Sequence, residues 1–271
     1  MNGQRDPGSL HQKEAAFHDQ WAGQTPLDRI AVRPAFEAPT AMENKFILRR
    51  MGPLSAVRLL DVGAGLGESA VYFALHGADV TAADVSPGMV ERAGELARFH
   101  GTSITAVACP AEAIAAPDND FDLVYIANTL HHVADKRAVF GQIRRVLKPG
   151  GRFFSIDPLA YNPVIDIYRR MATAVRTPDE KPLTFADVTL AREFFTDVSH
   201  HEFWIASLAL FVKYFLLDRV HPNAERYWKR IYEPQPLWWW LPLRTADGLL
   251  TRLPLVRRMA WNMVMWGTKP L

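Results

Sequence analysis

A glycine-rich turn is the part of the sequence best suited to hold a ligand. It reads Asp61-Val62-Gly63-Ala64-Gly65-Leu66-Gly67 and follows a short apolar run that starts at Arg58. Glycines adopt positive φ without strain and let backbone N–H groups approach a ligand closely. A purely structural tight turn has the same pattern, so the turn indicates a binding site only in combination with other features.

A second carboxylate, further along the chain, is one such feature. Asp84 ends the next apolar run, 23 residues after Asp61, where it can accept hydrogen bonds from both ribose hydroxyls of an adenosyl ligand. Dinucleotide-binding enzymes share this feature. An acid directly before the turn would repel a pyrophosphate but suits a sulfonium and an amino group. The G-x-G-x-G spacing also differs from the dinucleotide G-x-G-x-x-G. Both details favour S-adenosylmethionine as the ligand.

Alternating short apolar runs and amphipathic segments must position these residues. We expect strands at 58–63, 79–84, 104–109, 121–128, 151–157, 198–205 and 259–268, and helices at 66–76, 87–100 and 135–147. Ser86 and Pro87 are suited to begin the second of these helices. Strands that alternate with helices predict an α/β fold whose parallel sheet is covered on both faces.

Composition limits the class of protein. The chain has 271 residues and a net charge of +2, too small to imply a nucleic-acid partner. A single cysteine, Cys109, allows no intrachain disulfide and fits a reducing compartment. The first residues of the chain are polar and lack the apolar region of a signal peptide. The longest apolar run, 205–217, is too short to span a bilayer. These features predict a cytoplasmic protein, with residues 1–13 as a mobile tail.

Four segments resemble motifs of class I S-adenosylmethionine-dependent methyltransferases, within the small-molecule branch of types 11 and 25. They are 59–70 (LLDVGAGLGESA), 80–90 (VTAADVSPGMV), 121–133 (FDLVYIANTLHHV) and 144–157 (RRVLKPGGRFFSID). The end of the chain (WNMVMWGTKP) is similar to the antiparallel last strand of that family. The resemblance implies a Rossmann-like, doubly wound, seven-stranded sheet that is mostly parallel. It divides the chain into an N-terminal tail and lid (1–50), a donor-binding core (51–204), a helical insertion that caps the site (205–258) and the last core strand (259–271).

The resemblance also implies roles for single residues. The donor-binding positions are Asp61, Gly63, Ala64, Gly65 and Gly67 around the methionine part, Asp84 at the ribose, Val85, Ala111 and Glu112 at the adenine, and Asn128 at the methionine end. The chain departs from the family at Cys109-Pro110-Ala111-Glu112, where Gly-Asp-Ala-Glu is frequent. The acid that would accept from the adenine amino group is therefore missing.

Methyl transfer needs alignment above all, because the donor is already activated. A base is needed only when the acceptor carries a proton, and His131 and His132 follow the fourth strand where the methyl group should point. This favours O-methylation, although the histidine pair is also consistent with packing or positioning. Further acceptor contacts are expected at Asp157, Tyr161 and Asn162, and at His18 and Trp21 of a lid helix. No cluster has metal-ligand spacing, so we expect no metal.

The segment from 205 to 271 is basic and rich in tryptophan. It carries ten Lys or Arg against four acids, a net +6, and it includes Trp238-Trp239-Trp240 followed by leucines and arginines. Trp and Arg are favourable at a lipid headgroup boundary, so this segment could dock on the inner face of an anionic membrane and admit a lipid-like acceptor. The alternative is that these tryptophans form the core of a helical cap.

Three other functions remain open from the sequence. A nicotinamide-dependent oxidoreductase is disfavoured by the turn spacing. A non-catalytic S-adenosylmethionine-binding protein would carry the same binding motifs. A nucleic-acid (RNA) methyltransferase is compatible with the basic segment, but the fourth strand lacks the Asn/Asp-Pro-Pro-aromatic signature that such enzymes often carry.

Overall fold

A seven-stranded sheet organises the protein. The computed structural model describes residues 7–23, 25–173 and 180–271. The strands are β1 (Arg58–Val62), β2 (Asp79–Asp84), β3 (Thr105–Ala108), β4 (Phe121–Ala127), β5 (Leu147–Pro158), β6 (Thr196–Phe203) and β7 (Asn262–Thr268). Their order is β3-β2-β1-β4-β5-β7-β6, and only β7 runs antiparallel to its neighbours. This confirms the predicted Rossmann-like α/β fold with an antiparallel last strand.

The strand residues alternate between two hydrophobic cores, one on each face of the sheet. Leu59 and Phe154 pack on one face, whereas their neighbours Leu60 and Phe153 pack on the other. Successive side chains of a strand point to opposite faces, so a strand covered on both sides must be apolar throughout. The near-continuous apolar runs of the sequence therefore mark the centre of the sheet.

Helices cover both faces. They include α3 (Met42–Met51), α4 (Glu68–Leu75), α5 (Pro87–Phe99) and α6 (Lys136–Val146). Ser86 begins α5 as predicted: its Oγ accepts from Met89 N at 3.0 Å. Asp135 caps α6 in the same way, accepting from Ala138 N at 3.1 Å.

The N-terminal region differs from the expectation of a mobile tail up to residue 13. Helix α1 (Pro7–Ala22) already begins at Pro7, followed by η1 (Leu27–Arg29) and α2 (Pro34–Glu37). Residues 1–6 of the predicted tail lie outside the described residues. The tail prediction was wrong for 7–13 because this stretch is helical, and His11 pairs with Glu112 of the core from that helix.

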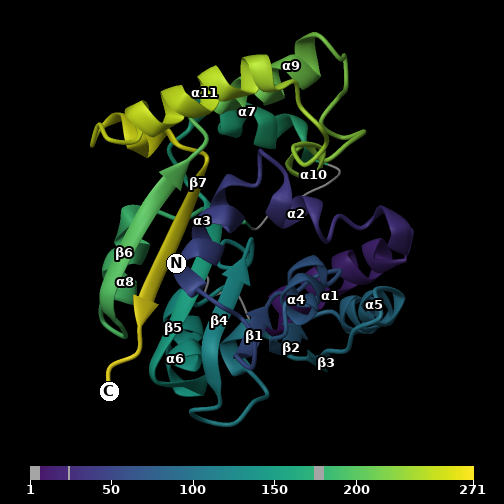
Figure 1. Cartoon of the computed structure of the whole chain (residues 1–271), viewed down its shortest axis with the longest axis vertical. Helices are drawn as coiled ribbons and strands as arrows, with labels where there is room; N and C mark the ends of the chain where they lie inside the picture. The colour runs from purple at the N-terminus through teal and green to yellow at the C-terminus, as the bar shows by residue number, and fades with distance from the viewer. Residues whose placement is uncertain (1–6, 24, 174–179) are drawn as a thin grey trace.

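A layer of helices lies across one end of the sheet. The segment between β5 and β6 contributes α7 (Pro163–Met171) and α8 (Phe185–Ala191). The segment between β6 and β7 contributes η4 (Ala206–Leu208), α9 (Ala209–Leu216), α10 (Tyr227–Arg230), α11 (Leu237–Leu250) and η5 (Val256–Met259). Figure 1 shows α7, α9 and α11 together at the end toward which the arrows of β4 and β6 point. We call residues 205–258 the cap. None of the described helices has the length and apolar character needed to cross a bilayer.

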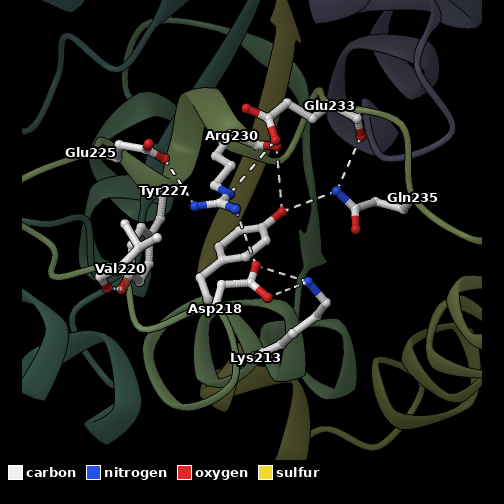
Figure 2. A network of polar contacts seen from close by, with 9 residues as sticks. Lys213, Asp218, Val220, Glu225, Tyr227, Arg230, Glu233 and Gln235 are labelled. Carbon is white, nitrogen blue, oxygen red and sulfur yellow. Dashed lines mark hydrogen bonds and ion pairs between the residues drawn. The ribbon is translucent and has the colours of Figure 1, made fainter.

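A polar network ties the turns of the cap together (Figure 2). Asp218 accepts from Lys213 Nζ at 2.9 Å and from a guanidinium nitrogen of Arg230 at 3.1 Å. Arg230 also pairs with Glu225 at 3.0 Å. The hydroxyl of Tyr227 donates to the carbonyl of Val220. These bonds fix the irregular connection from α9 to α10, which has few apolar residues of its own.

The three consecutive tryptophans of α11 have different environments. Trp240 is fully buried, with 0% of its surface exposed, and packs against Trp204 at a ring-centroid distance of 5.5 Å. Trp239 is half-buried and Trp238 is 81% exposed. Successive helical residues point about 100° apart, so one helix cannot turn all three to the same surface. Trp240 therefore belongs to the core of the cap, which was one alternative from the sequence. Trp238 is exposed, as the other alternative, contact with a membrane, would require.

Candidate functional site

The glycine-rich turn lies where the sheet changes direction. β1 sits between β2 and β4, so the chain leaves β1 to one side and later returns on the other. In open α/β sheets this switch point, at the carboxyl ends of the strands, is where ligands bind. Gly63 has φ 70°, and a Cβ there would lie 2.0 Å from Oγ1 of Thr129. Only glycine fits this position, because any side chain would collide with the end of β4.

Asp84 is positioned at the end of β2 by two backbone N–H groups. Its carboxylate accepts from Gly65 N and from Ser86 N, both at 2.9 Å. The side chain is buried, and burial raises the pKa of Asp84 above its usual range, although these hydrogen bonds oppose the shift. The carboxylate is therefore held rigidly beside the glycine-rich turn.

A cleft of about 80 Å³ opens at this point, and we call it the donor cleft. Of the predicted donor-binding residues, the ones that line it are Gly63, Asp84, Val85, Ala111, Glu112 and Asn128. The described lining contains three acids and three histidines but neither Lys nor Arg. This charge suits a cationic ligand and opposes a diphosphate.

The other predicted donor residues lie behind the cleft surface. Ala64, Gly65 and Gly67 shape the turn without lining the cleft. Asp61 is buried, and its Oδ2 accepts from the hydroxyl of Ser69 at 2.5 Å. Burial raises the pKa of Asp61 to about 7, so this carboxyl exchanges a proton near neutral pH.

Helix α1 lies across the cleft and supplies the predicted His18 together with His11 and Glu14, which the sequence reasoning missed. His11 pairs with Glu112 at 3.1 Å. Glu14 lies 3.5 Å from Nε2 of His18 and 3.4 Å from Nδ1 of His132. His11, Glu14 and His18 follow one another at spacings of three and four, which places them on one helical face. This spacing could have indicated the helical face from the sequence, but residues 1–13 were interpreted as a mobile tail.

Asp19 docks the same helix onto the core. Its Oδ1 accepts from the hydroxyl of Ser86 at 2.5 Å and from Gly88 N at 2.9 Å. A Cβ at Gly88 would lie 2.8 Å from this oxygen. These bonds join α1 to the first turn of α5, next to Asp84, and fix the helix over the donor cleft.

His131 forms a buried pair with Asp157. Nδ1 of His131 lies 2.8 Å from Oδ1 of Asp157, and the same oxygen accepts from the backbone N of His131 at 3.2 Å. Burial holds the pKa of Asp157 well above its usual range. The adjacent ring of His132 lies 4.1 Å away and lines the cleft. The pair thus fixes the orientation of an imidazole at the junction of β4 and β5, beside the donor cleft.

One group of side chains has the closeness that metal binding requires. Ligand atoms of His131, His132 and Glu180 lie within 4.8 Å of one another. The sequence spacing gave no sign of this group, because Glu180 is far from the histidines along the chain. Since Nδ1 of His131 faces Asp157, the geometry serves a hydrogen-bonded imidazole equally well, and we retain the absence of a metal as a prediction.

The remaining predicted acceptor residues lie outside the lining of the donor cleft. Asn162 is buried and caps α7: its Oδ1 accepts from Val164 N at 2.9 Å and from Ile165 N at 3.1 Å, and its amide donates to the carbonyl of Met259. Both ends of its side chain are therefore engaged, and we no longer assign it to the acceptor. Tyr161 stacks on Phe185 at a ring-centroid distance of 5.7 Å.

Trp21 joins the lid to the cap. The guanidinium of Arg226 lies 3.6 Å from the centre of the Trp21 ring, and Nζ of Lys229 lies 4.6 Å from it. Lys229 also reaches Glu68 of α4 at 3.4 Å. Burial lowers the pKa of Arg226 to about 10, so this cation keeps its charge at neutral pH. Trp21 thus contacts the cap, and its contact with the acceptor stays a prediction.

Comparison with known proteins gives one family. Residues 60–155, from β1 to β5, match the family model described as a methyltransferase domain. The relatives include the uncharacterized methyltransferase YcgJ of Bacillus subtilis, 32% identical over 45% of this chain and 49% of the relative. The ubiquinone/menaquinone biosynthesis C-methyltransferase UbiE of Shewanella halifaxensis is 33% identical over 48% and 53%. The sterol 24-C-methyltransferase ERG6B of Gibberella zeae is 33% identical over 49% and 36%.

These matches cover the donor half of the molecule. The chain spans about half the length, or less, of the curated relatives it matches. Among solved structures, YcgJ of Bacillus subtilis has a TM-score of 0.54 at 20% identity, over 85% of this chain and 99% of its own. Phosphoethanolamine N-methyltransferase 2 of Haemonchus contortus, in complex with S-adenosylhomocysteine, has a TM-score of 0.58 at 19% identity, over 95% and 60%. At these identities the structures share the fold.

Proposed function

Residues 60–155 form a methyltransferase domain of the class I, S-adenosylmethionine-dependent family, and from this premise we propose that the protein methylates a small or lipid-like acceptor. The charge of the donor cleft carries the proposal. Its described lining has three acids and neither Lys nor Arg, as a sulfonium donor requires. The same charge disfavours a nicotinamide dinucleotide, whose diphosphate would meet three acids and neither Lys nor Arg of the described lining.

The residues of the cleft fit this donor. Asp84 would accept from the ribose hydroxyls, with Val85 against the adenine. Ala111 and Glu112 would line the rest of the adenine pocket, and Asn128 would meet the methionine end. Asp61, behind the turn, would face the positive charge of the donor as an ionised carboxylate. When bound, S-adenosylmethionine supplies an activated methyl group.

We propose O-methylation with His131 as the general base. Nδ1 of His131 lies 2.8 Å from Oδ1 of Asp157, and Nε2 would take the proton from an acceptor hydroxyl. Asp157, whose pKa burial holds well above its usual range, would orient the ring through this contact. His132 would act differently, since its Nδ1 lies near Glu14 and links the cleft to the lid.

C-methylation is the second candidate, and the names of the relatives favour it. UbiE and ERG6B are both named as C-methyltransferases, of ubiquinone/menaquinone biosynthesis and of a sterol. Either reaction is compatible with an apolar acceptor. A carbon acceptor that must lose a proton would use the same imidazole.

The decisive experiment is a screen for methyl transfer. The full chain would be incubated with isotopically labelled donor and fractions of polar metabolites, lipids and RNA, and the methylated atom of any product would be assigned by NMR. Label in a small molecule or lipid supports the proposal, and label in RNA supports the nucleic-acid alternative. Tight donor binding without transfer to any fraction would indicate a non-catalytic donor-binding protein.

A chelator gives a second test of the same chemistry. Dialysis against EDTA should leave the rate unchanged, because neither the base nor the donor requires a cation. A rate that falls and returns with one divalent metal would instead assign His131, His132 and Glu180 to a metal site.

We further propose that residues 205–258 act as a cap that docks on an anionic membrane from the cytoplasmic side. Its exposed apolar side chains include Leu216, Leu217, Trp238, Leu253 and Leu255. Exposed arginines lie beside them along the chain, including Arg244, Arg252 and Arg258. Apolar and cationic side chains together are favourable at an anionic headgroup boundary. A membrane-bound enzyme would reach a lipid-like acceptor directly.

Flotation with vesicles tests the docking. Trp238→Ser should reduce binding to vesicles that contain phosphatidylglycerol, because it removes the most exposed tryptophan of α11 without touching the buried Trp240. The matched control is Phe99→Ser, which removes another exposed aromatic, 55% exposed, from α5. Equal binding of the wild type to neutral and anionic vesicles, or equal loss in both variants, would exclude docking through the cap.

A further inference from the structure

A second cavity lies away from the donor cleft and shares no lining residue with it. Its volume is about 140 Å³, which is room for several water molecules. It opens between α3, β6 and α11, so the donor-binding core and the cap both contribute to it. The catalytic proposal uses none of its residues.

Three cations gather around this cavity. Lys45 and Arg49 stand one turn apart on α3, and Arg244 approaches from α11. Within the described part of the chain, none of the three has a carboxylate at ion-pair distance. Burial lowers the pKa of Lys45, and the positive charges of Arg244 and Arg49 lower it further, against the opposing charge of Glu37. The cations therefore form a positively charged rim to which an anion could bind.

The acids of the cavity do not provide that offset, because they are engaged elsewhere. Asp247 accepts from the backbone N of Ile205 at 3.1 Å and of Ala206 at 2.6 Å, and from the hydroxyl of Ser207. Glu202 lies 2.5 Å from Nδ1 of His200. Both carboxylates are buried and hold the fold together at the rim of the cavity.

A fourth nitrogen group completes the polar lining. His201 stacks on Phe46 at a ring-centroid distance of 5.0 Å and an interplanar angle of 14°. Burial lowers its pKa, so the ring is neutral at pH 7 and offers an N–H donor rather than a charge. Two guanidinium groups, an ammonium and an imidazole N–H can together serve the several oxygens of one compact anion.

From this geometry we propose that the cavity binds a phosphate group. A phosphate monoester carries about −1.5 to −2 charge and three acceptor oxygens, which matches a site with three cations. A single carboxylate would leave most of these donors without a partner. The cavity has room for a phosphate group. This site stands apart from methyl transfer and does not depend on the acceptor.

The phosphate could belong to a lipid headgroup or to a free phosphorylated molecule. Leu241 stands one turn before Arg244 on α11, and Trp238 another turn before it, both with exposed side chains. A phosphate with an apolar tail could use these side chains, whereas a free phosphate would use the cavity alone. The chemistry of recognition is the same in both cases, and the experiment separates the sources.

Calorimetric titration of the full chain with inorganic phosphate at low salt tests the site. We expect saturable binding that Arg49→Gln and Arg244→Gln each weaken about tenfold or more, since each removes a charge-assisted contact. The matched control is Arg98→Gln, which removes an exposed arginine of α5 and should change nothing. Arg49→Lys should recover part of the affinity. Thermal unfolding of each variant checks that the fold is intact.

A second arm uses vesicles of phosphatidylcholine with or without phosphatidic acid. Recruitment by phosphatidic acid that depends on both Arg49 and Arg244 assigns the site to a headgroup. Saturable binding of inorganic phosphate without recruitment assigns it to a free phosphorylated molecule. The proposal is overturned if the wild type binds neither phosphate nor these vesicles, or if the folded Arg49→Gln, Arg244→Gln double variant binds both as the wild type does.

Discussion

The two cavities of this protein carry opposite charge. The donor cleft is lined by acids and histidines, and the second cavity is lined by three cations around two carboxylates that are already engaged. A buried carboxyl with a pKa of about 7 lies near each of them: Asp61 behind the donor cleft, and Glu43 close enough to Asp247 to feel its charge. The same chain thus forms two cavities whose linings would attract ligands of opposite charge.

The difference shows what decides ligand choice in this fold. The switch point of the strand order would place a dinucleotide or a sulfonium donor at the same edge of the sheet. The acids that point into the cleft separate the two, and they come from β2, from the segment after β3 and from α1. Fold therefore places the ligand, and the charge of a few side chains selects it.

The largest expected effect concerns the chemistry of the donor side. His131→Ala should lower methyl transfer about 10²–10⁴-fold, because it removes the proposed base, while donor affinity stays within twofold. Asp157→Asn should act in the same direction by releasing the orientation of the ring. Labelled-donor turnover measures the rate and calorimetry the affinity. The matched control is His132→Ala, for which a smaller loss is expected. An equal or larger loss in His132→Ala would move the base to that residue.

The next effect concerns stability at the cap side. Glu43 is buried, its Oε1 accepts from Asn262 Nδ2 at 2.7 Å, and burial raises its pKa from 4.5 to about 7. Between pH 4.5 and 7 the folded state therefore holds a proton that the unfolded state has lost. The free energy of unfolding should fall as pH rises through this window, by up to about 3 kcal/mol from this group.

Glu43→Gln removes that titration and checks its sign. The variant should gain stability relative to the wild type as pH rises from 5 to 8, as measured by urea unfolding at each pH. Glu95→Gln, at a partly exposed position of α5, serves as a control that should leave the pH dependence unchanged. A wild type that becomes more stable over this range, with Glu43→Gln following it in parallel, would contradict the assignment.

Donor affinity gives a smaller effect that separates the cavities directly. Asp84→Ala should weaken S-adenosylmethionine binding by about 1–3 kcal/mol, because ribose hydroxyls would lose their acceptor. The same variant should bind phosphate at the second cavity as the wild type does. Glu91→Gln, exposed on α5, is the control. Unchanged donor affinity in a folded Asp84→Ala variant would remove the ribose assignment.

The smallest effect is a proton released on donor binding. A cationic donor favours the ionised form of Asp61, whose pKa is about 7 in the free protein, so affinity should rise about tenfold between pH 6 and pH 8. Calorimetry in two buffers of different ionisation enthalpy counts the released protons. Asp61→Asn should remove this dependence. If that variant keeps it, another group supplies the proton.

The donor half could be predicted from the sequence because its signals are local. The turn, Asp84 and the apolar runs follow directly from spacing, and β2 was predicted with the bounds that the structure shows. The contacts of the lid helix α1 could not be predicted from local spacing. Asp19 meets Ser86 and Gly88 across 67 and 69 residues of chain, and no local pattern encodes such a contact. Glu14 was missed for the same reason.

The cap and the second cavity show the other limit of sequence reasoning. Composition correctly marked 205–271 as unusual, yet it treated Trp238 and Trp240 alike. Only packing against Trp204 decides which of the two is buried. Lys45, Arg49 and Arg244 are ordinary surface residues in the sequence, and they form a cluster only because α3 and α11 converge on β6.

The contact of Trp21 with Arg226 and Lys229 has a consequence for the order in which donor and acceptor bind. The helix proposed to cover the donor and the segment proposed to cap the acceptor meet at one indole ring, through Arg226 and Lys229. An acceptor that draws the cap closer would also press the lid onto the donor and so raise the affinity for the donor. Thermodynamic reciprocity then requires the bound donor to raise the affinity for the acceptor by the same factor. Such coupling would favour a sequential mechanism through a ternary complex and keep the methyl donor from escaping before its partner arrives.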